Sequence, residues 1–225
     1  MFPGATDHVN YDVAQLADSD EIIRLLAEVF SESEPPAVAM GLSFRDMEEF
    51  LQLIVPAVVP LGLTVISRST APSGMMSRRN DTRKLAGVLL TDDFALPPAL
   101  HPGRISSKLL PILSMLEILD EQFRRGRAIS PGEYLHLFML AVDREFAGCG
   151  IGQRLVKACV ENGLQKGYRM ALTEATGRVS QHIFRKNGFA DRFSVSYRDF
   201  LYENKTVFAA IREHDKAILM DRPLA

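Results

Sequence analysis

A strand, a glycine-rich turn and a helix follow one another in the segment LHLFMLAVDREFAGCGIGQRLV, residues 135–156, and this order strongly constrains the fold. The apolar run ends at Val142, and glycines follow at positions 148, 150 and 152. Apolar residues then recur at helical spacing from Ile151 to Cys159. Glycine lets the backbone approach a ligand closely, and free N–H groups at a helix start attract an anion. The segment therefore predicts a site for a phosphate-bearing ligand.

Size and charge narrow the class of protein. The chain has 225 residues and a formal net charge of −2, which fits one domain over 1–225 and does not favour a nucleic-acid partner. Prolines and a glycine interrupt the longest apolar stretch, 51–66, so we expect no membrane span. The N-terminus lacks the basic start and apolar core of a signal peptide. Two cysteines make a disulfide framework or a metal site improbable, and a cytoplasmic protein is expected.

Hydrophobic periodicity predicts alternating strands and helices, and hence a mixed sheet covered by helices. Helices are expected over 18–30, 43–55, 106–125 and 180–186, with Pro111 implying a kink or a late start in the third. Strands are expected over 11–15, 63–67, 84–92, 134–142, 169–175, 193–197 and 217–220. The polar, basic segment 69–83 between two of these strands is predicted to be a flexible loop.

Three known phosphate-binding loops compete for the glycine turn. A dinucleotide-binding fingerprint needs glycine where Gln153 stands, and a Walker loop needs a Gly-Lys-Ser/Thr ending that is absent. The third pattern fits: the segment resembles motif A of the GNAT family of acetyl-CoA-dependent N-acetyltransferases. Gly148 and Gly150 match that motif, whereas Glu145 and Ala147 replace residues that are usually polar or basic. A plain glycine turn without a ligand is the alternative.

A second segment, SQHIFRKNGF at 180–189, resembles the GNAT helix and turn that flank the pantetheine arm. Lys186, Gly188 and Phe189 match that pattern directly, and Ile183 replaces a leucine. Phe184 stands where many members of the family have a tyrosine general acid, and a phenyl ring cannot donate a proton. The insect-type arylalkylamine N-acetyltransferases also lack this tyrosine, so the chain resembles that branch in particular.

Three further segments resemble the same branch: FSESEPPAVAMGL at 30–42, LLPILSMLEILDEQF at 109–123, and REHDKAILM at 212–220. The branch carries a helical insertion over the acceptor side, which here corresponds to 95–127. Its glutamate before the proline is the general base, and the matching residue is Glu34. An alkylammonium has a pKa of about 10, so the attacking amine needs such a base. A solvated surface acid is the alternative role for Glu34.

The resemblance also implies Ser180 as the general acid for the leaving thiolate, with Thr176, His214 or water as alternatives. A helix N-cap is the structural alternative for Ser180. His136 and His182 match no motif. An aromatic slot for an arylalkylamine would be built from Phe30, Phe44 and Phe50, whose alternative role is core packing.

The implied fold is α/β (α+β) of the GNAT type, with a mixed, mostly antiparallel sheet that splays in a V between the parallel strands 134–142 and 169–175. The implied cosubstrate is acetyl-CoA, with no metal. Its expected binding residues are Leu140, Ala141, Val142, Ala147, Gly148, Cys149, Gly150, Ile151, Gly152, Gln153 and Phe184.

The expected reaction is acetyl transfer to a primary amine of a small, arylalkylamine-like molecule, by direct attack in a ternary complex. Polyamine, aminoglycoside or protein amines are alternative acceptors, and a non-catalytic acyl-CoA-binding module is the alternative class. A monomer or homodimer without nucleic-acid or membrane partners is expected.

Overall fold

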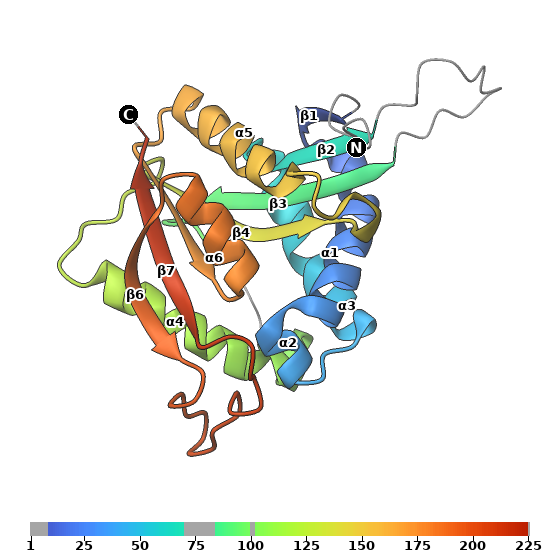
Figure 1. Cartoon of the computed structure of the whole chain (residues 1–225). Helices are drawn as coiled ribbons and strands as arrows, with labels where there is room; N and C mark the ends of the chain where they lie inside the picture. The colour runs from blue at the N-terminus through green and yellow to red at the C-terminus, as the bar shows by residue number, and fades with distance from the viewer. Residues whose placement is uncertain (1–8, 70–83, 100–101, 225) are drawn as a thin grey trace.

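The computed structural model describes residues 9–69, 84–99 and 102–224, and a seven-stranded sheet forms its centre (Figure 1). The strands lie in the order β1-β2-β3-β4-β5-β7-β6. Their bounds are β1 Val9–Val13, β2 Val65–Ser69, β3 Leu85–Asp93, β4 Tyr134–Val142, β5 Met170–Ala175, β6 Ala190–Ser196 and β7 Lys216–Pro223. Within the sheet that the structure describes, β4 and β5 are the one parallel pair. The predicted mixed, mostly antiparallel sheet is therefore confirmed.

Helices cover both faces of this sheet and give it two hydrophobic cores. They are α1 Ser19–Ser33, α2 Pro35–Ala39, α3 Phe44–Val58, α4 Leu110–Arg124, α5 Ile151–Gln165 and α6 Arg178–Lys186. Figure 1 shows α5 and α6 on one face and α1, α3 and α4 on the other. Every residue of the inner strand β3 is buried, because both faces of that strand are covered. This layering explains why the β3 sequence is mostly apolar rather than alternating.

Local sequence signals fix where the helices begin. The Ser43 hydroxyl accepts a hydrogen bond from the Asp46 N–H, and the Asp46 carboxylate accepts one from the Ser43 N–H, so α3 starts with a capping box at Ser43. Pro111 lies in the first turn of α4, where a missing N–H costs nothing. Of the two outcomes predicted for Pro111, the late start is the one observed.

The sheet opens between β4 and β5. These strands pair only at Tyr134–Met170, Leu135–Ala171 and His136–Leu172, and no further pair follows along either strand. On the other side of β4, the pairing with β3 passes from Met139 to Leu137, so Phe138 is an extra residue in a β-bulge. A bulge bends its strand, which turns the end of β4 away from β5. The predicted V-shaped splay is confirmed, whereas the bulge was not predicted.

Several predicted bounds were shifted or lie outside the described residues. The first strand covers 9–13 instead of 11–15, because its pairing with β2 sets its ends. The helix predicted over 180–186 is α6, and it starts at Arg178 instead of Ser180. Within the predicted loop 69–83, Ser69 ends β2 and the rest lies outside the described residues. Over the described ranges, no helix combines the length and apolar character that a membrane crossing requires.

Candidate active site

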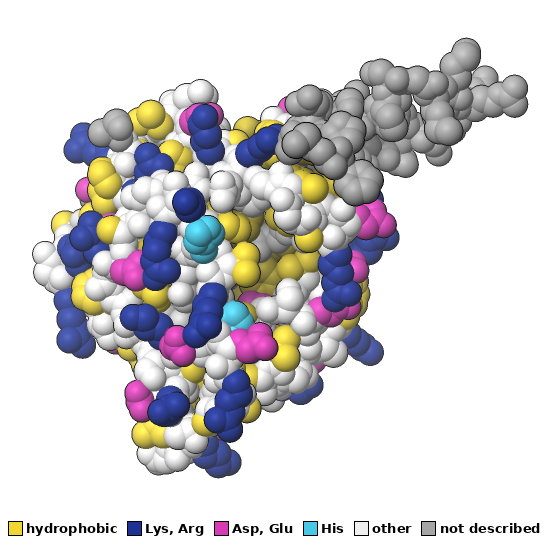
Figure 2. All heavy atoms as spheres, in the orientation of Figure 1, with side chains coloured by type: hydrophobic (Ala, Val, Ile, Leu, Met, Phe, Trp, Pro, Cys, Tyr) yellow, Lys and Arg dark blue, Asp and Glu magenta, His cyan; other side chains and the backbone are white. Residues whose placement is uncertain are grey.

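A cavity of about 370 Å³ begins where β4 and β5 part. Segments far apart in the sequence supply its walls: the end of α1 with α2, the first half of α4, the second half of β4, the end of β5, and α6. Figure 2 shows the opening as a hollow with hydrophobic side chains inside. Four of the predicted catalytic candidates, Glu34, Thr176, Ser180 and His214, line this one cavity.

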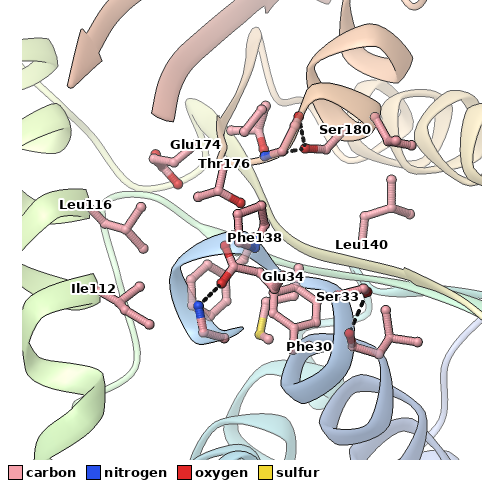
Figure 3. Close-up of a pocket in the computed structure, with 18 of the residues that line it drawn as sticks. Phe30, Ser33, Glu34, Ile112, Leu116, Phe138, Leu140, Glu174, Thr176 and Ser180 are labelled. Carbon is pink, nitrogen blue, oxygen red and sulfur yellow. Dashed lines mark hydrogen bonds between the residues drawn. The ribbon is translucent and has the colours of Figure 1, made fainter. Parts of the chain in front are cut away.

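Glu34 stands at the junction of α1 and α2 and points into this cavity (Figure 3). Its Oε2 accepts a hydrogen bond of 2.5 Å from the Ala37 N–H and thereby caps α2, and Pro35 occupies the first turn as expected after a cap. Its Oε1 is buried and has no partner within the described chain. Burial raises the Glu34 pKa from 4.5 to about 7, against the Ala37 N–H hydrogen bond and the nearby Thr176 side chain, which both lower it. The alternative of a solvated surface acid is therefore wrong.

Ser180 lines the cavity opposite Glu34, on the first turn of α6 (Figure 3). It is the third residue of the helix, and Gly177 is the N-cap, so the N-cap alternative for Ser180 is wrong. Its hydroxyl donates to the Gly177 carbonyl at 2.9 Å and accepts from the Gly177 N–H at 3.3 Å. Both bonds orient the hydroxyl at the mouth of the sheet opening.

The two alternative proton donors occupy the same region. Thr176 follows β5, and the Tyr197 hydroxyl donates a 2.6 Å hydrogen bond to its carbonyl. His214 accepts the Arg178 N–H on Nδ1 at 3.1 Å, which leaves Nε2 as the donor nitrogen of a neutral ring. Sequence reasoning did not identify Tyr197, which is 1% exposed and fixes the segment after β5.

The glycine loop has the form of an anion site. Gly148 and Gly150 have φ of 77° and 74°, conformations that L side chains rarely adopt. No side chain caps α5, so the N–H groups of its first turn, at 151–153, point out of the helix end. Two of the predicted donors are already used, since Ala147 N donates to Arg144 O at 3.1 Å and Cys149 N to Phe146 O at 3.3 Å. The remaining donors are concentrated at the helix start.

Gly152 also serves packing. A Cβ added there would lie 3.0 Å from Ile183 Cδ1 and 3.7 Å from Leu140 Cδ2. The close approach of α5 to α6 and β4 thus requires glycine at this position. Leu140, Val142 and Phe184, three of the residues predicted to bind the cosubstrate, line the cavity, whereas the Ala141 side chain packs in the core on the α1 side of the sheet.

Glu145, a departure from the usual motif, does not add an uncompensated negative charge. Lys84, just before β3, lies 2.6 Å from its carboxylate and 2.9 Å from that of Asp143. Both ion pairs are partly exposed, so they contribute little to stability. They nevertheless place an ammonium group beside the loop, which the sequence pattern could not show because Lys84 is 61 residues away.

A buried polar cluster beside the cavity was missed. His136 of β4 is 8% exposed, with Nδ1 at 2.8 Å from Asp92 Oδ1 and Nε2 at 2.8 Å from Glu174 Oε2. Asp92 of β3 pairs with His136 of β4, and Glu174 lies on β5 two residues beyond Leu172, the partner of His136. Each of the three is a polar residue within a mostly apolar strand. That interruption was the available signal. Among the described residues, no group has the arrangement of a metal site.

Comparisons with known proteins agree with this geometry. Residues 112–189 match the model of the Acetyltransferase (GNAT) family. The C-terminal condensation domain of Ebony, in complex with beta-alanyl-dopamine, superposes with a TM-score of 0.84 at 16% identity, over 96% of this chain and 98% of that one. Arylalkylamine N-acetyltransferase 2 from Aedes aegypti gives 0.75 at 17% identity, over 96% and 99% of the two chains.

Polyamine N-acetyltransferase from Drosophila melanogaster gives a TM-score of 0.68 at 17% identity, again over 96% and 99%. At these identities the solved structures establish the fold, and the family model adds the acetyltransferase segment. Residues 112–189 thus match the GNAT acetyltransferase family, which supports an acyltransferase enzyme, and the whole chain has the fold of the insect arylalkylamine N-acetyltransferases.

Proposed function

We propose that the protein transfers an acetyl group from acetyl-CoA to a primary amine of a small molecule, by direct attack within a ternary complex. The observation that carries this proposal is the free, buried Oε1 of Glu34 in the cavity at the sheet opening. The fold neighbours include arylalkylamine and polyamine N-acetyltransferases, which by their names act on amines of this kind.

The residues at the sheet opening fit acetyl-CoA, which supplies the acetyl thioester. Among the described strands, none pairs with β4 on its β5 side beyond His136, so backbone groups of 140–142 can bond an extended pantetheine arm like an added strand. The open helix start of α5 and the left-handed glycines suit the diphosphate. Phe184, which is buried in the last turn of α6, would pack against the pantetheine arm.

Glu34 would take the proton from the incoming ammonium, directly or through water. A base with a pKa of about 7 is about half ionised at neutral pH and still accepts protons readily. Because Oε2 caps α2, Oε1 is held in place and remains available. Ser180 would protonate the departing thiolate, exchanging its bond to the Gly177 carbonyl for the new one.

The acceptor side of the cavity suits an amine with an apolar body. Phe30, Phe50 and Phe138 line it, together with leucine and isoleucine side chains of α4. Phe44, one of the three predicted slot residues, is 39% exposed and lies outside the cavity, so that prediction is wrong. Phe138 takes its place, because the bulge in β4 turns the ring toward the acceptor side. We propose the segment 95–127 as the cover of this side.

The test measures acetyl transfer from acetyl-CoA to a panel of arylalkylamines and alkylamines. The Glu34→Gln variant keeps a carbonyl oxygen for the Ala37 N–H but removes the base, and kcat/KM should fall by about 100-fold or more. Glu28→Gln removes an exposed acid of α1 and should leave the rate unchanged. Wild-type kcat/KM should rise with pH through about 7, since the ionised form of Glu34 is the active one.

Two outcomes would contradict the proposal. Full turnover by Glu34→Gln would remove this residue from the mechanism. Binding of acetyl-CoA without transfer to any amine would favour a non-catalytic acyl-CoA-binding module instead.

A further inference from the structure

Two buried side chains hold the end of β5 and the turn that follows it. Gln181 of α6 donates to the Ala175 carbonyl at 3.1 Å, and the Tyr197 hydroxyl donates to the Thr176 carbonyl at 2.6 Å. Ala175 is the last residue of β5 that pairs with β7, so beyond it side chains take over from the bonds of the sheet. The backbone is therefore fixed at a point where it lines the cavity.

Tyr197 is a rigid anchor for this turn. Its ring packs edge-on against Phe208 with the centroids 5.8 Å apart, and Phe208 stacks on Phe200 at 5.3 Å. Its backbone N–H donates to the Asp215 carbonyl at 3.0 Å, which ties together the two ends of the loop between β6 and β7. Because ring and backbone are both held, the hydroxyl oxygen has a fixed position, and so does the Thr176 carbonyl that it bonds.

The Thr176 side chain connects this anchor to Glu34, the proposed base. Thr176 lines the cavity and points toward Glu34 in Figure 3. Burial raises the Glu34 pKa, whereas the Ala37 N–H and the Thr176 side chain lower it, as donors that favour a charged carboxylate do. Burial and then the negative charge of Glu34 raise the Tyr197 pKa, so the phenol lies within electrostatic reach of that carboxylate and keeps its proton as a donor.

We propose that Tyr197 is a positioning residue for the acetyl transfer: by bonding the Thr176 carbonyl, it aims the Thr176 hydroxyl at Glu34 and so favours the ionised, proton-accepting form of that base. Tyr197 is buried behind the residues that line the cavity, so it acts through Thr176. The inference rests on the proposed function in taking Glu34 as the base. Its effect can nevertheless be measured without any substrate, because it changes the ionisation of one carboxyl group.

The experiment follows the Glu34 carboxyl of the full chain by carbon-13 NMR as the pH is raised, with its signal identified as the one that Glu34→Gln removes. Tyr197→Phe removes the hydroxyl and keeps the ring that packs on Phe208. The Glu34 titration should then move upward from about 7 by about one pH unit, the size expected for the loss of one hydrogen bond to a charged group. Tyr202→Phe, which removes a hydroxyl elsewhere in the same loop, should leave the titration unchanged.

Two variants of Thr176 test whether Tyr197 acts through that residue. Thr176→Val removes the hydroxyl with little change of shape and should raise the Glu34 pKa as Tyr197→Phe does, whereas Thr176→Ser keeps a hydroxyl and should titrate like the wild type. Adding Tyr197→Phe to Thr176→Val should cause no further rise, because the hydroxyl that Tyr197 positions is already gone. A further rise in the double variant would overturn the inference. An unchanged titration in Thr176→Val would overturn it too, even if Tyr197→Phe failed to fold.

Acetyl transfer gives a second measurement and separates this inference from the proposed function. In Tyr197→Phe, kcat/KM should fall by about tenfold at pH 6 and stay near the wild-type value at pH 9, where Glu34 is ionised in both proteins. An equal fall at both pH values would assign Tyr197 a purely structural role and overturn the inference. Transfer by the wild type without any shift of the Glu34 titration in Tyr197→Phe would keep the acetyltransferase proposal and overturn the positioning role. A shifted titration in a protein that acetylates no amine would do the reverse.

Discussion

Glu34 divides two tasks between its two carboxylate oxygens. Oε2 caps α2 through the Ala37 N–H, and Oε1 faces the cavity without a partner. The cap fixes the side chain, so that the free oxygen is held in place before any substrate arrives. Keeping this oxygen buried and unpaired costs stability, because ionisation there is disfavoured. Such a cost at a single residue is typical of a site that serves reaction chemistry rather than folding.

This cost predicts that replacing Glu34 by glutamine increases the free energy of unfolding, by an amount that depends on pH. Burial raises the Glu34 pKa from 4.5 to about 7, so the folded state holds this proton more tightly than the unfolded state. The resulting stabilisation is present below pH 4.5 and is lost as the pH rises to about 7. At pH 8, Glu34→Gln should therefore be more stable than the wild type by about 1–3 kcal/mol. Urea unfolding at pH 8 and pH 4.5, with Glu28→Gln as control, measures this. A constant offset at both pH values would contradict it.

At the scale of elements, the glycine loop and α5 make a specific prediction. Gly150 and Gly126 both have positive φ, 74° and 70°, and a Cβ at either would meet nothing within 4 Å. Alanine at either position should cost about 1 kcal/mol of stability through backbone strain. Only at Gly150 would the new methyl group lie at the proposed diphosphate site. Gly150→Ala should weaken acetyl-CoA binding by about tenfold or more, whereas Gly126→Ala should not. Isothermal titration calorimetry measures both affinities for acetyl-CoA. Equal affinities of Gly150→Ala and Gly126→Ala would exclude this loop as the diphosphate site.

The elements themselves were largely predictable, because their signals are local. Each of these signals depends only on a few neighbouring residues. Examples are the capping residue Ser43, the glycine turn, and Pro111 in the first turn of α4. The bulge at Phe138 was not predictable, since it depends on the pairing of two strands about 50 residues apart in the chain. Lys84 beside Glu145 and Asp92 beside His136 were missed for the same reason, because contacts between distant strands leave no local pattern.

At the scale of the molecule, the sheet is two units that meet at a short seam. Strands β1 to β4 form one unit with α1 and α3, and β5, β7 and β6 form the other. Three paired positions between β4 and β5 join them, together with the 2.7 Å hydrogen bond from the Thr173 hydroxyl to the Leu137 carbonyl. The cavity lies beyond this seam, so the opening proposed for the cosubstrate lies where the sheet has few bonds between strands.

A ligand seated in the opening should therefore stabilise the whole molecule by completing the seam. At 100 times its dissociation constant, acetyl-CoA should add about 2.7 kcal/mol, or roughly 5–10 °C in Tm for a chain of this size. Pantetheine, which lacks the diphosphate, should raise Tm far less at equal concentration. Hydrogen exchange should slow along 137–142 and 147–153, because the unpaired side of β4 and the start of α5 gain partners. Strands β1 and β2 lie at the far edge of the sheet from the seam and serve as the internal control. A rise in Tm without protection of β4 would place the cosubstrate elsewhere and contradict the proposed arrangement.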